Sequence, residues 1–203
     1  MVNNFLDIKK YLVFKSADDF YLLFIKKRRK DNPGLEHGEI EISTFYITSV
    51  IDLERLMPLI ISICNTTNSR SYINLNSRSF KSVALHTNKK LGEILVNGDY
   101  KYARKIYESE SNSHSNTEDK KWLIDFDYED GHGCTKNDQN TFNEMIEFIE
   151  KEQKICGNEP LSDIIRTKFG VHVITRPFRI NRFKEKYPNI DVHKEPVTLL
   201  SIF

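Results

Sequence analysis

Two aspartates, Asp125 and Asp127, stand two residues apart at the end of an apolar segment, 122–127. In a β-strand alternate side chains share a face, so both carboxylates would point to one side while Ile124 and Phe126 point to the core. Two carboxylates this close repel each other, and a divalent cation held by oxygen ligands relieves that repulsion. The pair therefore predicts a site for Mg²⁺ or Mn²⁺. The alternative is a strand that ends in a solvated acidic turn.

A histidine follows about 45 residues later on a second predicted strand. His172 lies between two valines and closely follows Gly170, which permits a close backbone approach or a tight turn. The imidazole could donate a hydrogen bond to a nucleotide phosphate, with Lys168 and Arg166 on the same hairpin as further phosphate ligands. The alternative is a partly buried histidine that is bonded to a neighbouring side chain.

A third aspartate, Asp191, comes after another short apolar approach. It could complete a metal site with Asp125 and Asp127, in which the carboxylates are both metal ligands and the catalytic groups. It could equally cap a turn.

The segment Arg70–Arg78 alternates between apolar and polar residues, as a strand does. Its apolar positions are Ile73 and Leu75. The polar positions on the other face are Arg70, Tyr72, Asn74 and Asn76, and Arg78 continues the alternation. Arginine binds phosphate, tyrosine stacks on bases and asparagine reads base or sugar edges, so this face suits a nucleic-acid strand or an incoming nucleotide. A solvated outer face of a sheet shows the same alternation.

Lys and Arg total 30 against 29 Asp and Glu in 203 residues, so no overall field attracts nucleic acid or a membrane. Polyanion binding would have to come from local clusters such as the basic run 26–30, which could instead be a hydrated strand end. The three cysteines do not suggest a disulfide framework. The N-terminus is too polar for a signal peptide and no apolar run has membrane-spanning length, so we expect a cytoplasmic protein without membrane contact.

The elements expected along the chain alternate between helices, hairpins and strands. A helix should begin after Ser49, another should begin at Ser79, and a third should be capped by Asp138 or Asn140. The polar stretch 108–119 should be a mobile loop. These patterns predict one α+β domain over 1–203, with the chemistry-bearing core at about 70–203.

Taken together and in this order, these motifs resemble the archaeo-eukaryotic primase (primase-polymerase) superfamily. That family carries an Asp-hydrophobic-Asp strand, a small-residue-x-His strand and a later hydrophobic-Asp pair. The corresponding residues here are Asp125 and Asp127, Gly170 and His172, and Asp191. The segment 72–78 is similar to the strand that often precedes the site in viral members.

The resemblance implies a sheet like that of the RNA-recognition motif, mixed or antiparallel and flanked by helices. It also implies Asp125, Asp127 and Asp191 as metal ligands, with His172 on the nucleotide phosphates and Lys168 or Arg78 helping to hold the triphosphate. The expected activity is template-directed nucleotidyl transfer, as in a DNA primase. The expected partners are nucleoside triphosphates, a single-stranded template and other replication proteins.

Three other functions use the same residues. A nucleic-acid-binding protein without catalysis would use the 70–78 face and the basic run. A metal-dependent nuclease would use the same carboxylates to activate water. A protein-interaction role would leave the acidic segment as a solvated surface.

Overall fold

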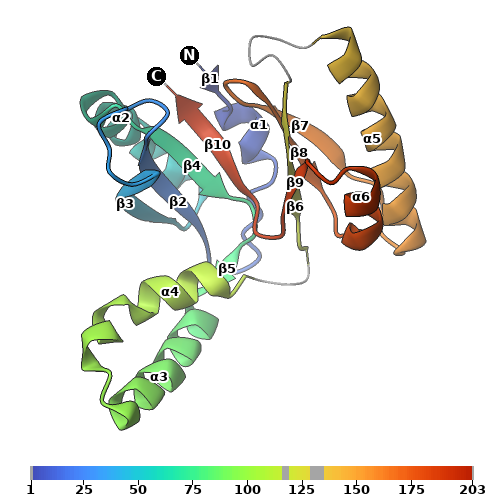
Figure 1. The fold of residues 1–203 in the computed structure, drawn as a ribbon. Helices are drawn as coiled ribbons and strands as arrows, with labels where there is room; N and C mark the ends of the chain where they lie inside the picture. The colour runs from blue at the N-terminus through green and yellow to red at the C-terminus, as the bar shows by residue number, and fades with distance from the viewer. Residues whose placement is uncertain (1, 116–118, 129–134, 203) are drawn as a thin grey trace.

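The computed structural model describes residues 2–115, 119–128 and 135–202, which form two antiparallel sheets with helices packed around them (Figure 1). The larger sheet has six strands. Its order is β1 (Val2–Asn3), β10 (Val197–Ile202), β4 (Arg70–Asn74), β2 (Asp19–Arg28) and β3 (Glu39–Ile47), with β5 (Arg78–Ser79) paired to β2. The first and last described strands pair with each other, which brings the two ends of the chain together (Figure 1).

The smaller sheet carries the predicted motifs. Its order is β7 (Ser162–Arg166), β8 (Gly170–Thr175), β6 (Trp122–Asp127) and β9 (Asp191–His193). Along the chain these strands alternate with α5 (Lys136–Ile155) and α6 (Ile180–Lys186) in the order β-α-β-β-α-β. Since β8 separates β6 from β7, this is the split β-α-β arrangement.

The remaining helices precede the small sheet in the chain. They are α1 (Phe5–Lys9), α2 (Val50–Thr67), α3 (Phe80–Asn97), the 3₁₀ helix η1 (Tyr100–Lys105) and α4 (Ile106–Ser113). Helices α3 and α4 form a hairpin that extends away from both sheets (Figure 1). The predicted α+β class, with antiparallel sheets flanked by helices, is confirmed.

Two apolar cores hold the small sheet in place because successive side chains of a strand point to opposite faces. Ile124, Phe126 and Val173 pack on one face against Met145 and Ile149 of α5. Leu123, Ile165 and Ile174 belong to a second core that also contains residues of the large sheet, α1 and α2. The motif strand β6 is therefore buried over much of its length, and its aspartates stand where that burial ends.

Local sequence signals account for several helix ends. Ser49 caps α2 as predicted, and Ser79, at which a helix was expected to begin, caps α3. Each accepts a hydrogen bond from the backbone three residues on. The predicted cap of α5 was wrong. Thr135 is the N-cap, and Asp138 completes a capping box from inside the first turn.

The prediction of a loop at 108–119 was also wrong in part, because residues 108–113 belong to α4; residues 116–118 lie outside the described residues. Arg78, which is fully buried, donates hydrogen bonds to the carbonyl oxygens of Ser111 and, at 3.3 Å, Asn112. These carbonyls lie in the last turn of α4, where the helix itself offers them no partner. A guanidinium from a distant strand thus stabilises the end of a helix whose own sequence is typical of a loop.

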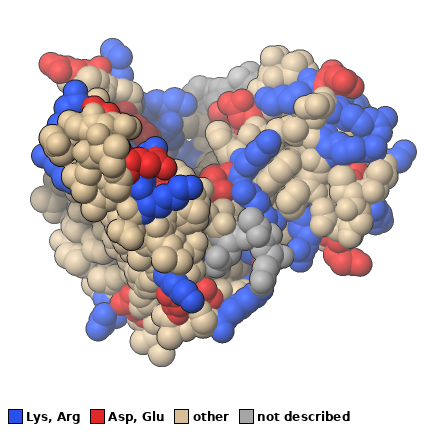
Figure 2. Space-filling model, turned by 90° about the horizontal axis from the view of Figure 1, so that it is seen from below, with Lys and Arg blue, Asp and Glu red and all other residues tan. Residues whose placement is uncertain are grey.

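No helix in the described part of the chain is both long and apolar enough to cross a membrane. The view from below shows side chains of both charge signs across the visible face (Figure 2), in keeping with a net charge of +1.

Gly170 should be essential to the small sheet. A Cβ atom at this position would lie 2.1 Å from the Phe126 carbonyl oxygen and 2.8 Å from Asp127 Cα. Gly170→Ala must push β8 away from β6, and we expect the free energy of unfolding to fall by about 1–3 kcal/mol. Gly92→Ala is the matched control, because Gly92 lies within α3 with no atom near its Cβ position, and it should be neutral or stabilising. Chemical denaturation measures the free energy of unfolding of both variants and of the wild type. A Gly170→Ala variant as stable as Gly92→Ala would contradict the prediction.

Candidate functional site

The predicted site residues come together through the register of three strands. Asp125 on β6 is paired directly with His172 on β8 and with Asp191 on β9. Directly paired residues of antiparallel strands place their side chains on the same face. The aspartates and the histidine therefore form one row across the sheet, on the face opposite α5 and α6.

Asp127 shares this face but lies one step along the strand, where it is paired with Gly170. Its side chain is exposed, and so is that of Asp191, which is 75% exposed and lies 3.6 Å from the Lys184 ammonium. Asp125 is the most enclosed of the three carboxylates, at 36% exposed.

His172 is held from both sides. Its Nδ1 lies 2.9 Å from the Thr198 hydroxyl of β10, and its Nε2 lies 3.4 Å from Asp125 Oδ1. The ring is only 12% exposed. The expectation of a partly buried histidine bonded to a neighbour thus describes its contacts, and the same contacts fix the ring at the wall of a pocket. Thr198 belongs to the large sheet, so this bond also joins the two sheets at the site.

The charge of Asp125 is favoured by its surroundings. Burial alone would raise the pKa of its carboxyl, but the hydrogen bond with His172 and the nearby charges of His172, His193 and Arg28 outweigh burial. The pKa therefore lies below its ordinary value, and Asp125 is ionised at neutral pH. An ionised carboxylate in a partly enclosed position is the state that binds a cation.

A pocket of about 410 Å³ opens in front of the row. Asp125, His172 and Asp191 line one side of it. Its cationic wall comes from the large sheet and consists of Lys26, Arg28 and Arg70. A smaller pocket of about 70 Å³ shares Asp125, His172 and Arg28 with it, and adds Lys30, Asp127 and Lys168. The basic run 26–30 thus contributes alternate residues to the site.

Lys26 of this wall pairs with Glu39 at 2.6 Å, and Glu39 lines the pocket as well, whereas Arg70 pairs with Asp31. Arg70 donates two hydrogen bonds to its carboxylate, at 2.6 and 2.7 Å, and Lys168 lies 3.4 Å away. The bond with Arg70 is the largest of the effects that hold the pKa of Asp31 below its ordinary value.

Arg28 donates a longer bond, 3.4 Å, to the Tyr72 hydroxyl. Arg28 lines both the larger and the smaller pocket. Among the described residues, none of its hydrogen bonds goes to a carboxylate.

Other predicted site residues lie elsewhere. Arg166 is paired with Val171, which places it on the opposite face of the small sheet from His172. Asn76 is buried and exchanges hydrogen bonds with the backbone of Lys121. Arg78 is occupied at the end of α4, and burial lowers the pKa of its guanidinium to about 10, so it is still charged at neutral pH. These placements do not favour a direct role in ligand binding.

The predicted 70–78 surface is not an outer sheet face. Strand β4 lies between β10 and β2, and all five of its residues are buried. Asn74 accepts a bond from the Asn76 backbone, whereas Arg70 and Tyr72 line the pocket. Only the first part of this segment could therefore touch a nucleic acid or a nucleotide.

Sequence reasoning missed three contributors to the site: Asp31, His193 and Thr198. Asp31 follows the basic run and could have been noticed as its counter-charge. His193 lies two residues after Asp191, so strand alternation would have placed it on the same face. Nothing in the local sequence indicates Thr198, because its contact with His172 depends on how the two sheets pack.

The three aspartates share a face without yet forming a compact ligand cluster. Among the described residues, the one group of three or more His, Cys, Asp or Glu whose ligand atoms all lie within 4.8 Å of one another is His86, Glu110 and His114, on other elements. The exposed side chains of Asp127 and Asp191 would have to turn toward Asp125 to share a cation with it.

The contact between His172 and Asp125 predicts a measurable pH effect. His172→Gln removes the imidazole charge, so the pKa of Asp125 should rise toward or above its ordinary value. Because the folded-state pKa of Asp125 is depressed, its stabilising contribution is present above the unfolded pKa, near 3.8, and is lost as pH falls through the folded value. Carboxyl NMR titration of Asp125 in both proteins measures the change, and an unaltered titration would show that His172 does not act on it.

Comparison of the chain with models of protein families, with curated proteins and with solved structures finds no match. What the protein does is therefore inferred from the pocket and the residues that line it.

Proposed function

We propose that the protein is a metal-dependent, template-directed nucleotidyltransferase of the primase-polymerase type. The observation that carries this proposal is the row of Asp125, His172 and Asp191, formed by strand register and opposed across the pocket by the cations of the large sheet. The β-α-β-β-α-β order of the small sheet supports the resemblance seen in the motifs.

The distribution of charge suits a nucleoside triphosphate. A triphosphate carries several negative charges, which arginine and lysine bind through charge-assisted hydrogen bonds. Arg28 and Lys26 line the wall opposite the aspartates, and Lys168 lines the adjoining small pocket. A ligand with a polyphosphate on one side and bound cations on the other would match both walls.

Asp125, Asp127 and Asp191 are the residues that would hold Mg²⁺ or Mn²⁺. Carboxylate oxygens are the ligands these ions prefer, and Asp125 is already ionised. When bound, such ions lower the pKa of an attacking hydroxyl and neutralise charge on the leaving pyrophosphate. The contribution of the protein is to hold the carboxylates on one face, from which the Asp127 and Asp191 side chains would turn toward Asp125 to share the ion.

His172 would bind and orient the phosphates. If the Thr198 hydroxyl donates to Nδ1, the neutral ring carries its proton on Nε2, beside Asp125 at the pocket wall. That N–H can then donate to a phosphate oxygen. Its burial and its two partners restrict the ring to one orientation, which is what a positioning group requires.

The template would approach along Arg70 and Tyr72, the residues of β4 that line the pocket, although the two residues are only 6% and 8% exposed. A metal-dependent nuclease would use the same aspartates, and a binding protein without catalysis would use the same cations. The experiments that follow separate these functions.

Asp125→Asn and Asp191→Asn should each reduce nucleotide incorporation by about 100-fold or more, because each removes a proposed metal-binding charge. The assay combines a single-stranded template, Mn²⁺ or Mg²⁺ and labelled nucleotides. Asp99→Asn is the matched control, an exposed aspartate on the helical hairpin, and it should keep full activity. Incorporation unchanged in the Asp125→Asn and Asp191→Asn variants would refute the proposal.

Two other results would favour the alternatives. Metal-dependent cleavage of nucleic acid without added nucleotides would indicate a nuclease. Salt-dependent binding that is indifferent to metal and to Asp125→Asn, together with no incorporation, would indicate a binding protein.

Arg28→Met should raise the KM for nucleoside triphosphates by about 10-fold or more, since it removes a charged donor from the pocket wall. Lys27→Met is the matched control, because Lys27 directly precedes Arg28 in the same basic run and lines neither of the two pockets. Steady-state kinetics with varied nucleotide measures both. Equal KM values for the two variants would exclude Arg28 from nucleotide binding.

A further inference from the structure

A second group of ligand-type side chains lies on the helical hairpin. His86 comes from α3, Glu110 from α4, and His114 is the residue that follows the last turn of α4. Their ligand atoms all lie within 4.8 Å of one another. In sequence His86 is separated from the other two by more than 20 residues, so the packing of α3 against α4 creates the group.

The hydrogen bonds of His114 fix which nitrogen can bind an ion. Its Nδ1 lies 3.2 Å from the Glu110 carbonyl oxygen and 3.1 Å from Glu110 Oε2. Both oxygens are acceptors when the carboxylate is ionised, so Nδ1 must carry the proton. A bound ion would take the place of that proton, because the 3.1 Å between Nδ1 and Glu110 Oε2 is close to the separation of two donors on one tetrahedral ion.

The two imidazole rings are stacked. Their centroids are 3.8 Å apart and their planes differ by 20°. An ion lies in the plane of each imidazole that binds it, so one ring must turn out of the stack for both rings to bind one ion. The side chain of Glu110 is 14% exposed and supplies the negative charge beside them.

We propose that His86, Glu110 and His114 bind Zn²⁺ and thereby fasten α4 to α3. Two imidazole nitrogens and one carboxylate oxygen are an established zinc donor set, with a fourth position left for water. Tetrahedral bonds of about 2.1 Å place donor atoms roughly 3.4 Å apart. Since His86 is exposed, a change of its side-chain rotamer can close the remaining gap. This site is separate from the aspartate row and does not depend on the function proposed for it.

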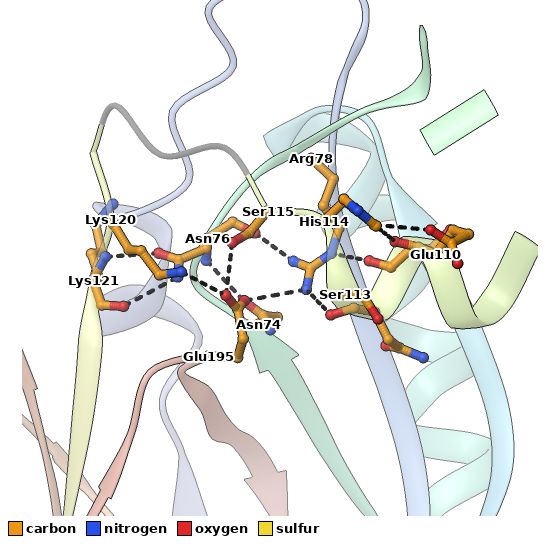
Figure 3. A network of polar contacts seen from close by, with 12 residues as sticks. Asn74, Asn76, Arg78, Glu110, Ser113, His114, Ser115, Lys120, Lys121 and Glu195 are labelled. Atoms are coloured by element: carbon orange, nitrogen blue, oxygen red, sulfur yellow. Dashed lines mark hydrogen bonds and ion pairs between the residues drawn. The ribbon is translucent and has the colours of Figure 1, made fainter. Parts of the chain in front are cut away.

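The position of the site gives the ion a structural consequence. Next to His114, Ser115 donates a hydrogen bond of 2.7 Å to Glu195, and Glu195 also contacts Lys120 and Arg78 (Figure 3). Glu195 in turn lines the pocket. A bound ion would hold the end of α4 from one side while Arg78 holds its carbonyls from the other. The helical hairpin would then be fixed relative to the pocket.

The test begins with protein freed of metal by a chelator and titrated with Zn²⁺. We expect the wild type to bind one equivalent of Zn²⁺ and His86→Ala to lose this binding. The thermal midpoint of the wild type should rise by roughly 5–10 °C at a Zn²⁺ concentration a hundredfold above Kd. Co²⁺ used as a probe should give the visible absorption of a tetrahedral site. Glu110→Gln should weaken binding in the same way.

Controls separate this site from folding defects and from the aspartates. His86 is exposed, so without metal His86→Ala should have the midpoint of the metal-free wild type. His37→Ala, which replaces another exposed histidine, should bind Zn²⁺ normally. The double variant Asp125→Asn and Asp191→Asn should also keep this binding. The proposal is overturned if His86→Ala keeps the Zn²⁺ affinity and the midpoint shift of the wild type. It is also overturned if the aspartate double variant loses the shift while His86→Ala keeps it.

Discussion

The pairing of β6 with β8 and β9 is the constraint on which the candidate site depends. A shift of one residue in either pairing would turn a whole strand over and send His172 or Asp191 to the helix-covered face. The apolar residues between the polar ones prevent that shift, because Ile124 and Val173 must stay in the core with α5. Gly170 allows the two backbones to approach at the end of the same ladder. The site is therefore a consequence of core packing.

The two sheets contribute opposite charges to the pocket. The small sheet supplies Asp125 and Asp191, and the large sheet supplies Lys26, Arg28 and Arg70 together with the carboxylate of Glu39. Asp31 pairs with Arg70 and Glu39 pairs with Lys26, which leaves Arg28 as the cation of this set whose hydrogen bonds in the described residues include no carboxylate. The hydrogen bond between Thr198 and His172 joins the sheets where the charges face each other. A contact that joins the two sheets thus also fixes a residue of the pocket wall.

Some buried polar side chains of the 70–78 segment stabilise the fold, although their residue types would also suit ligand binding. Arg78 is an arginine on an alternating strand, but the fold directs it to carbonyl oxygens at the end of α4. Asn76 is likewise bonded to the backbone of Lys121, close to the start of β6. A buried guanidinium without such partners would be strongly unfavourable, so these bonds are a condition for burying it. The second half of the 70–78 segment therefore supports the framework, and Arg70 and Tyr72 are the residues of this segment that line the pocket.

The sequence by itself determined the α+β class, the cap at Ser49, the start of a helix near Ser79 and the shared face of Asp125 and Asp127, because these follow from local periodicity and short-range hydrogen bonds. It also indicated His172 and Asp191 as candidates. Only the tertiary structure decided that they align with Asp125, that Arg166 does not, and that Thr198 completes the site. Alternation states which residues of one strand share a face, whereas strand register and sheet packing decide what that face meets.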